Sequence, residues 1–206
     1  MNGPQRSPLD HARRKMLLAS ASALLGTAAA LRPANAAAPQ RPDWIALPRM
    51  PDAALIDQEG HELCLLSDVL EGKKVAISFM FTGCATVCPP QTALLQEALR
   101  QMRERAGLKD VRMVALTVDP LGDGPKQLRD YARRFDLPLE RDGGWTLLTG
   151  HLKQIGPVLK SFGVAAGAPN DHPSVVWIGD EPSGRWTRTS SLNPPETVVR
   201  LFEALL

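Results

Sequence analysis

Residues 75–90 read VAISFMFTGCATVCPP, and this stretch decides the fold. Its first seven residues are a continuous apolar run, which is typical of a strand buried on both faces. Prolines at 89 and 90 suit the first turn of a helix, and apolar residues recur after them at helical spacing. The sequence therefore predicts a buried strand, then a turn that carries Cys84 and Cys88, then a helix.

Outward from this stretch, strand and helix patterns alternate. We expect strands at 111–118, 145–148, 174–178 and 185–189, helices at 125–135, 151–162 and 194–206, and an N-terminal hairpin of 54–57 with 62–66. Such alternation places helices on both faces of a mixed central sheet. A thioredoxin-like fold keeps its redox or metal cysteines at the turn after the first buried strand. We therefore predict an α/β, thioredoxin-like domain over residues 53–206, with an added N-terminal β-hairpin.

Residues 1–36 have the features of an export signal. A polar segment that ends in Arg13-Arg14-Lys15 precedes a run of 16 apolar and small residues, and Ala34-Asn35-Ala36 is a small-x-small cleavage site. The arginine pair is typical of a twin-arginine signal peptide. Because the apolar run is shorter than the ~20 residues that span a bilayer, we expect membrane contact only if this segment stays uncleaved.

The charge of the 206-residue chain depends on that signal. The formal net charge is +2, but residues 1–36 hold five basic residues and one acidic residue, so residues 37–206 carry −2. A nucleic-acid partner therefore has no support. Residues 37–52 contain four prolines and are predicted to be a linker that becomes an ordered arm near Trp44. The predicted compartment is the bacterial periplasm, where thiols can be oxidised.

The cysteine pair suits either metal binding or disulfide chemistry. N–H groups and the dipole at a helix start stabilise thiolates. Three residues separate Cys84 from Cys88, one more than in the usual exchange motif, so both sulfurs can bind one ion and still close as a disulfide. Soft thiolates favour Cu(I) or zinc, while a purely structural disulfide stays an open alternative. Cys64, between two leucines, is expected to be a buried free cysteine.

A third ligand is sought among the histidines. His172 lies just before the strand at 174–178, and in a thioredoxin-like fold this loop returns over the cysteine turn. A neutral imidazole there would complete a Cys2His set, although from position alone a surface role is the alternative. His61 and His151 are expected at the surface.

The chain resembles the SCO/SenC family, the copper-binding thioredoxin-like proteins that serve cytochrome oxidase assembly. The resemblance runs from about residue 53 to 206 and rests on FMFTGCATVCP (79–89), Val118-Asp119-Pro120 through Phe135, Trp145 with Leu148-Thr149-Gly150, Phe162-Gly163-Val164, and Asp171-His172. It implies that Cys84, Cys88 and His172 are the copper ligands. It also places Asp119 near the site as an outer-shell or partner-contacting carboxylate, with a turn or cap role as the alternative.

Two positions depart from the usual family pattern. Ala85 stands where the family has proline, and Pro173 stands where the family has a small hydroxyl residue. His172-Pro173-Ser174 is also similar to the cis-proline loop of thiol-disulfide oxidoreductases, and a cis bond is feasible before proline.

The resemblance implies a periplasmic metallochaperone that carries copper, as Cu(I) or Cu(II), for a cytochrome c oxidase. Its expected partner is a copper-accepting oxidase subunit or another periplasmic copper chaperone. The alternative function is a thiol-disulfide reductase, in which Cys84 and Cys88 are the redox pair and the substrate is the cysteines of the oxidase copper site.

Overall fold

The computed structural model describes residues 42–139, 144–167 and 169–206. The predicted signal peptide and the first part of the predicted linker lie outside these residues. Residues 41–206 belong to one compact unit. Within the described part of the chain, no helix is both long and apolar enough to cross a membrane.

The strands form a single mixed sheet. They are β1 (Ala54–Asp57), β2 (Glu62–Cys64), β3 (Lys74–Met80), β4 (Arg112–Thr117), β5 (Trp145–Thr149), β6 (Val175–Asp180) and β7 (Arg185–Ser190). Their order across the sheet is β2-β1-β5-β4-β3-β6-β7. Strands β3, β4 and β5 are parallel, and the other pairs are antiparallel. The predicted mixed sheet and N-terminal hairpin are confirmed.

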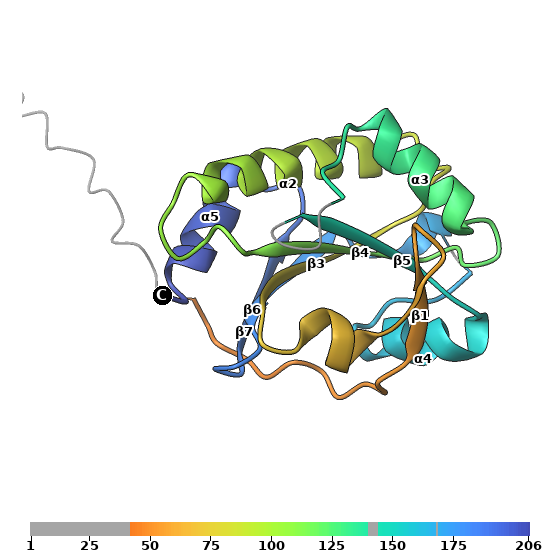
Figure 1. Ribbon diagram of the computed structural model, residues 1–206, viewed down its shortest axis with the longest axis horizontal. Helices are drawn as coiled ribbons and strands as arrows, with labels where there is room; N and C mark the ends of the chain where they lie inside the picture. The colour runs from red at the N-terminus through yellow and green to blue at the C-terminus, as the bar shows by residue number, and fades with distance from the viewer. Residues whose placement is uncertain (1–41, 140–143, 168) are drawn as a thin grey trace, which may run out of the picture. The chain divides into compact units, whose positions relative to one another are not determined.

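Helices cover both faces of this sheet, as predicted. They are α2 (Cys88–Arg103), α3 (Pro125–Arg134), α4 (Leu152–Ser161) and α5 (Pro195–Glu203), with a π-helical turn η1 (Leu65–Leu70) and a 3-10 turn η2 (Pro169–Asp171). Figure 1 shows α2, α3 and α5 on one face and α4 with η1 on the other. Strand β3 serves both layers because its side chains alternate: Ala76 and Met80 pack with the α2 layer, and Ile77 and Phe79 with the α4 layer.

One element differs from the prediction. The second hairpin strand ends at Cys64 instead of Leu66, and the chain turns into η1. The strand ends here because two carboxylates accept its backbone N–H groups. Asp52 accepts the N–H of Leu66 at 2.7 Å, and Asp68 accepts the N–H of Cys64 at 2.7 Å. These bonds satisfy amides that a continued strand would have left at a sheet edge.

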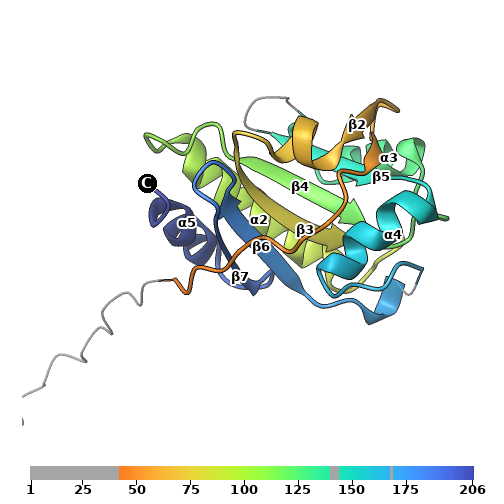
Figure 2. The same ribbon diagram turned by 90° about the horizontal axis from the view of Figure 1, so that it is seen from below.

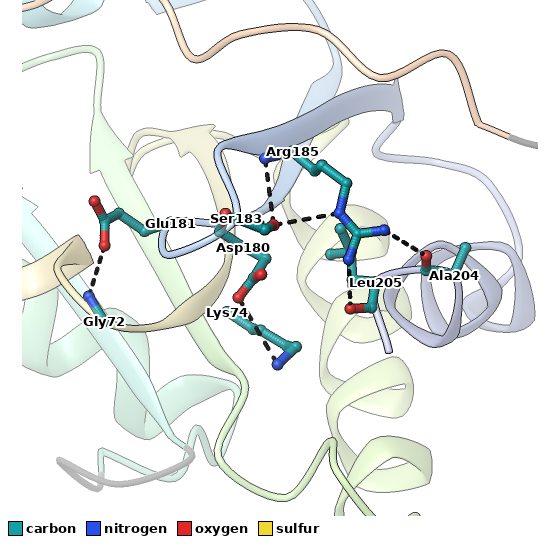
Figure 3. Close-up of polar contacts among 8 residues, drawn as sticks. All are labelled: Gly72, Lys74, Asp180, Glu181, Ser183, Arg185, Ala204 and Leu205. Carbon is teal, nitrogen blue, oxygen red and sulfur yellow. Dashed lines mark hydrogen bonds and ion pairs between the residues drawn. The ribbon is translucent and has the colours of Figure 1, made fainter.

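The predicted arm is ordered. It runs across the α4 side of the sheet (Figure 2, orange), and Ile45 forms an antiparallel bridge with Trp186. Arg185, at the start of β7, stacks over the Trp44 ring at 5.3 Å and donates to the Leu205 carbonyl at 2.9 Å (Figure 3). One side chain thus joins the arm to the end of the chain.

Candidate metal centre

The two cysteines lie together at the surface turn between β3 and α2. The Cys84 N–H donates to the Phe81 carbonyl at 3.2 Å, and this bond closes the turn. Gly83, Ala85 and Thr86 are exposed, whereas Cys84 is 7% exposed and Cys88 is fully buried. The sulfurs therefore lie just beneath an accessible loop, where a partner protein can approach them.

Hydrogen bonding makes the two sulfurs unequal. The backbone N–H of Cys88 donates to the Cys84 sulfur at 3.3 Å. Burial alone would raise the pKa of Cys84, but the Cys88 thiol and the backbone N–H groups of residues 86–88 outweigh it and lower that pKa to about 7. Burial, the hydrogen bond with Cys84 and nearby negative charge raise the pKa of Cys88 to about 12. None of the three cysteines of the chain forms a disulfide in this structure. Near neutral pH the Cys84 thiol is therefore partly ionised, whereas Cys88 keeps its proton.

A buried carboxylate supports this turn from behind. Asp123, 2% exposed, accepts the N–H of Thr82 at 3.0 Å and the Thr82 hydroxyl at 2.5 Å. It also accepts the hydroxyl of Thr117, the last residue of β4, at 2.5 Å. Buried charge needs such donors. Asp123 therefore fixes the residue two positions before Cys84 to the neighbouring strand, a role that the sequence did not reveal because the partners are 41 positions apart.

Helix α3 packs against the start of α2. The Tyr131 hydroxyl shares a hydrogen bond with the Thr92 hydroxyl at 2.6 Å and reaches the Cys88 carbonyl at 3.5 Å. The exposed Arg134 donates to the Thr82 carbonyl at 2.9 Å while its guanidinium stacks over the Tyr131 ring. These contacts, also missed from sequence, hold both the loop and the helix that carry the cysteines.

His172 lies beside the turn, but it is not grouped with the two cysteines as a set of metal ligands. Its ring meets Phe81 edge-on with 6.4 Å between centroids, and its Nδ1 lies 3.4 Å from the Pro173 carbonyl oxygen. Among the described residues, no three His, Cys, Asp or Glu side chains are grouped to hold a metal ion. The loop therefore returns toward the cysteine turn as expected, without bringing the imidazole into a completed set.

The cis bond considered before Pro173 is not found, since every peptide bond in the described segments is trans. The trans form is favoured even before proline, and the Pro173 carbonyl accepts the Val175 N–H at 2.9 Å as the chain enters β6. The similarity of this loop to the cis-proline loop of oxidoreductases does not extend to its backbone.

Asp119 is placed in a turn. Its carboxylate accepts the Gly122 N–H at 3.2 Å, and its own N–H donates to the Thr117 hydroxyl at 3.0 Å. This is the cap role that was the alternative for this residue.

The prediction for Cys64 is wrong in one respect. Cys64 is half-exposed rather than buried, because its strand β2 lies at the edge of the sheet. His61 and His151 are exposed, as expected.

A dithiol at a strand-to-helix turn, in a mixed sheet with helices on both faces, defines a thioredoxin-like protein with a metal or redox site. The sequence profile described as SCO1/SenC matches residues 50–199. The chain belongs to the SCO1/SenC family.

Individual relatives agree with this assignment. The SCO1 protein homolog of Bacillus subtilis is 34% identical over 122 residues, which are 58% of this chain and 60% of that protein. BsSco, described as a Sco-family cytochrome c oxidase assembly protein with a disulfide switch, has a solved structure with a TM-score of 0.63 and 28% identity, covering 80% of this chain and 98% of that one. Copper-bound ScoI of Bradyrhizobium japonicum gives a TM-score of 0.58 at 26% identity, covering 76% and 99%.

Proposed function

We propose that this chain is a periplasmic copper-binding protein that delivers copper to a cytochrome c oxidase during its assembly. The observation that carries the proposal is the Cys84–Cys88 pair, two soft donors beneath an exposed turn, one of them with a pKa lowered to about 7. Membership of the SCO1/SenC family and a copper-bound relative support it. The export features of residues 1–36 support the periplasmic location.

The cargo ion fits this donor set. Cu(I) would bind both sulfurs, and the Cys88 proton would be released because only the thiolate is a ligand. His172 would become the third ligand, above all for Cu(II). For this, the 169–174 loop would move the imidazole from its place beside Phe81 toward the sulfurs. Asp119, at the same edge of the sheet, stays a candidate for contact with the partner.

Copper titration tests the proposal. Reduced residues 37–206 should take up one Cu(I), and Cys84→Ser with Cys88→Ser should abolish that uptake. His172→Ala should remove the thiolate-to-Cu(II) absorption while Cu(I) uptake remains. Cys64→Ser is the matched control and should bind like the unmodified chain. Stoichiometric copper in the Cys84/Cys88 double variant would show that the assigned site is wrong.

A second candidate function is disulfide reduction of the oxidase copper-site cysteines. The unequal pKa values favour it, since a pair of nucleophile and resolving thiol needs that asymmetry. Cys84 thiolate would attack the partner disulfide, and Cys88 would then displace the second partner thiol, so that the partner gains two electrons and Cys84–Cys88 is oxidised. His172→Ala separates the functions: reductase activity should survive it, whereas Cu(II) binding should not.

A further inference from the structure

Helix α3 concentrates positive charge in a chain whose mature part is slightly acidic. Over its ten residues it has one acidic side chain, Asp130, and four basic ones: Lys126, Arg129, Arg133 and Arg134. Residues 37–206 together carry a formal net charge of −2. The positive charge of α3 is therefore a local feature of the surface.

Three of the basic side chains face solvent, and we call them the basic face: Lys126, Arg133 and Arg134. The side chains of Lys126 and Arg133 are 75% and 77% exposed, and both pair with the single carboxylate of Asp130. Exposed pairs of this kind are weak, and one carboxylate cannot neutralise two cations. Arg129 differs, because its guanidinium donates to the Gln58 carbonyl at 2.6 Å.

The basic face borders the cysteine turn. Arg134, at the end of α3, donates to the Thr82 carbonyl, and Asp123, just before α3, accepts the Thr82 N–H. Both ends of the helix segment are thus fastened to one residue, two positions before Cys84. A protein that covers this turn therefore lies next to Arg134 and the end of α3.

An exposed apolar side chain lies close to this charge in the sequence. Leu121, in the loop that leads into α3, is 81% exposed, more than any other large hydrophobic residue in the described segments. An apolar residue with charged neighbours is the usual composition of a protein interface, in which the anchor is buried and the charges form the rim.

Resting on the proposed function, we propose that the basic face and Leu121 dock an acidic region of the copper-accepting protein. Copper transfer requires the acceptor's ligands to reach the sulfurs under the exposed turn. Opposite charge would raise the encounter rate at this edge of the sheet, and Leu121 would lose its exposed surface to the partner. The acceptor is therefore expected to carry acidic side chains beside its own copper ligands.

Two synthetic acceptor peptides test this proposal. They share a dithiol and a phenylalanine, and they differ only in flanking glutamates or glutamines. Cu(I)-loaded residues 37–206, which hold the whole compact unit, are mixed with each peptide and the transfer rate is followed by stopped flow. We expect about ten-fold faster transfer to the glutamate peptide at low salt, and this preference should shrink as salt is raised.

Variants locate the effect. Lys126→Gln with Arg133→Gln should remove most of the preference, whereas Lys153→Gln with Lys160→Gln on α4, an equal change of charge on the other face of the sheet, should keep it. Arg134→Gln should weaken the preference and Arg134→Lys should retain it. Leu121→Ser should slow transfer to both peptides by a similar factor.

The outcomes separate this proposal from the function on which it rests. A chain that does not load Cu(I) overturns the proposed function, and the docking surface with it. A loaded chain that transfers copper equally fast to both peptides, or one in which the α4 variant behaves like the α3 variant, overturns the docking surface alone. Unchanged transfer in Leu121→Ser would show that the apolar anchor is wrong.

Discussion

At the scale of single residues, the Cys84 thiol should ionise near neutral pH, because hydrogen bonds lower its pKa to about 7. Its alkylation by iodoacetamide, followed by mass spectrometry, should show an inflection near pH 7 while Cys88 stays unreactive, since burial raises its pKa to about 12. Cys88→Ala removes one of the lowering hydrogen bonds and should move the inflection upward. Cys64→Ser should leave it in place. An inflection near 9 would contradict this account of the site.

The same two pKa values give a sign to the pH dependence of stability. The folded pKa of Cys84 lies below the ordinary 9.0, so its stabilisation is complete above pH 9 and is lost as the pH falls through 7. The folded pKa of Cys88 lies above 9.0, so stability declines between pH 9 and 12 as the unfolded chain loses this proton first. Urea unfolding of the reduced protein should thus show a rise from pH 7 to 9 that Cys84→Ser abolishes.

Asp123 gives a second prediction at this scale. In Asp123→Asn, an amide N–H replaces one of the oxygens that now accept from Thr82 and Thr117. The amide is neutral and can accept at only one of its two polar atoms, so at least one of the bonds now made to the carboxylate is lost or reversed. We expect a loss of about 1–3 kcal/mol in the free energy of unfolding, measured in urea. Asp130→Asn, at an exposed carboxylate, is the matched control and should stay within about 0.5 kcal/mol of the unmodified protein. An equal loss of stability in both variants would show that Asp123 does not support the cysteine turn.

At the scale of elements, two glycines should respond differently to alanine. Gly179 in β6 pairs with Trp186 in β7, and a Cβ on it would overlap the buried indole ring. Gly179→Ala should therefore cost about 1–3 kcal/mol of stability through overpacking. Gly156 in α4 has no atom outside its chain neighbours within 4 Å of such a Cβ. Because Pro157 follows it in the helix and disfavours a Cβ on the preceding residue, the usual gain from replacing a helical glycine is offset, and Gly156→Ala should stay within about 0.5 kcal/mol of the unmodified protein. Thermal unfolding of both variants measures the contrast, and an equal loss of stability in both would contradict the packing described for β6 and β7.

Elements with their own sequence pattern could be predicted, and those held by distant side chains could not. The apolar run of β3 and the prolines at the start of α2 are local signals, and from them the strand-to-helix turn that carries Cys84 and Cys88 could be predicted. The turn η1 depends on Asp52, which lies 14 positions from its partner Leu66. The support from Asp123 likewise joins positions far apart, and its only sequence signal is polar residues at the ends of two buried strands.

At the scale of the whole molecule, the cysteine pair and the contacts of Arg185 with Trp44 and Leu205 lie at opposite ends of β3. Lys74, at the first position of β3, pairs with Asp180 beside the hairpin that carries Arg185 (Figure 3), whereas the cysteines follow its last residue. A strand rises about 3.3 Å per residue, so roughly 20 Å separates the two ends. Changes at the hairpin should therefore alter the stability of the fold without altering the sulfurs.

Arg185→Ala tests this separation. The substitution removes the stacking on Trp44 and the bond to the Leu205 carbonyl, and we expect a loss of about 1–2 kcal/mol. Hydrogen exchange should quicken at the amides of Ile45 and Trp186, which bond to each other's carbonyls. Arg188→Ala, which loses only a ring contact, should cost about 0.5 kcal/mol. The alkylation profile of Cys84 should not change in either variant, and a shift of that profile in Arg185→Ala would mean that the arm and the metal centre are coupled through the sheet.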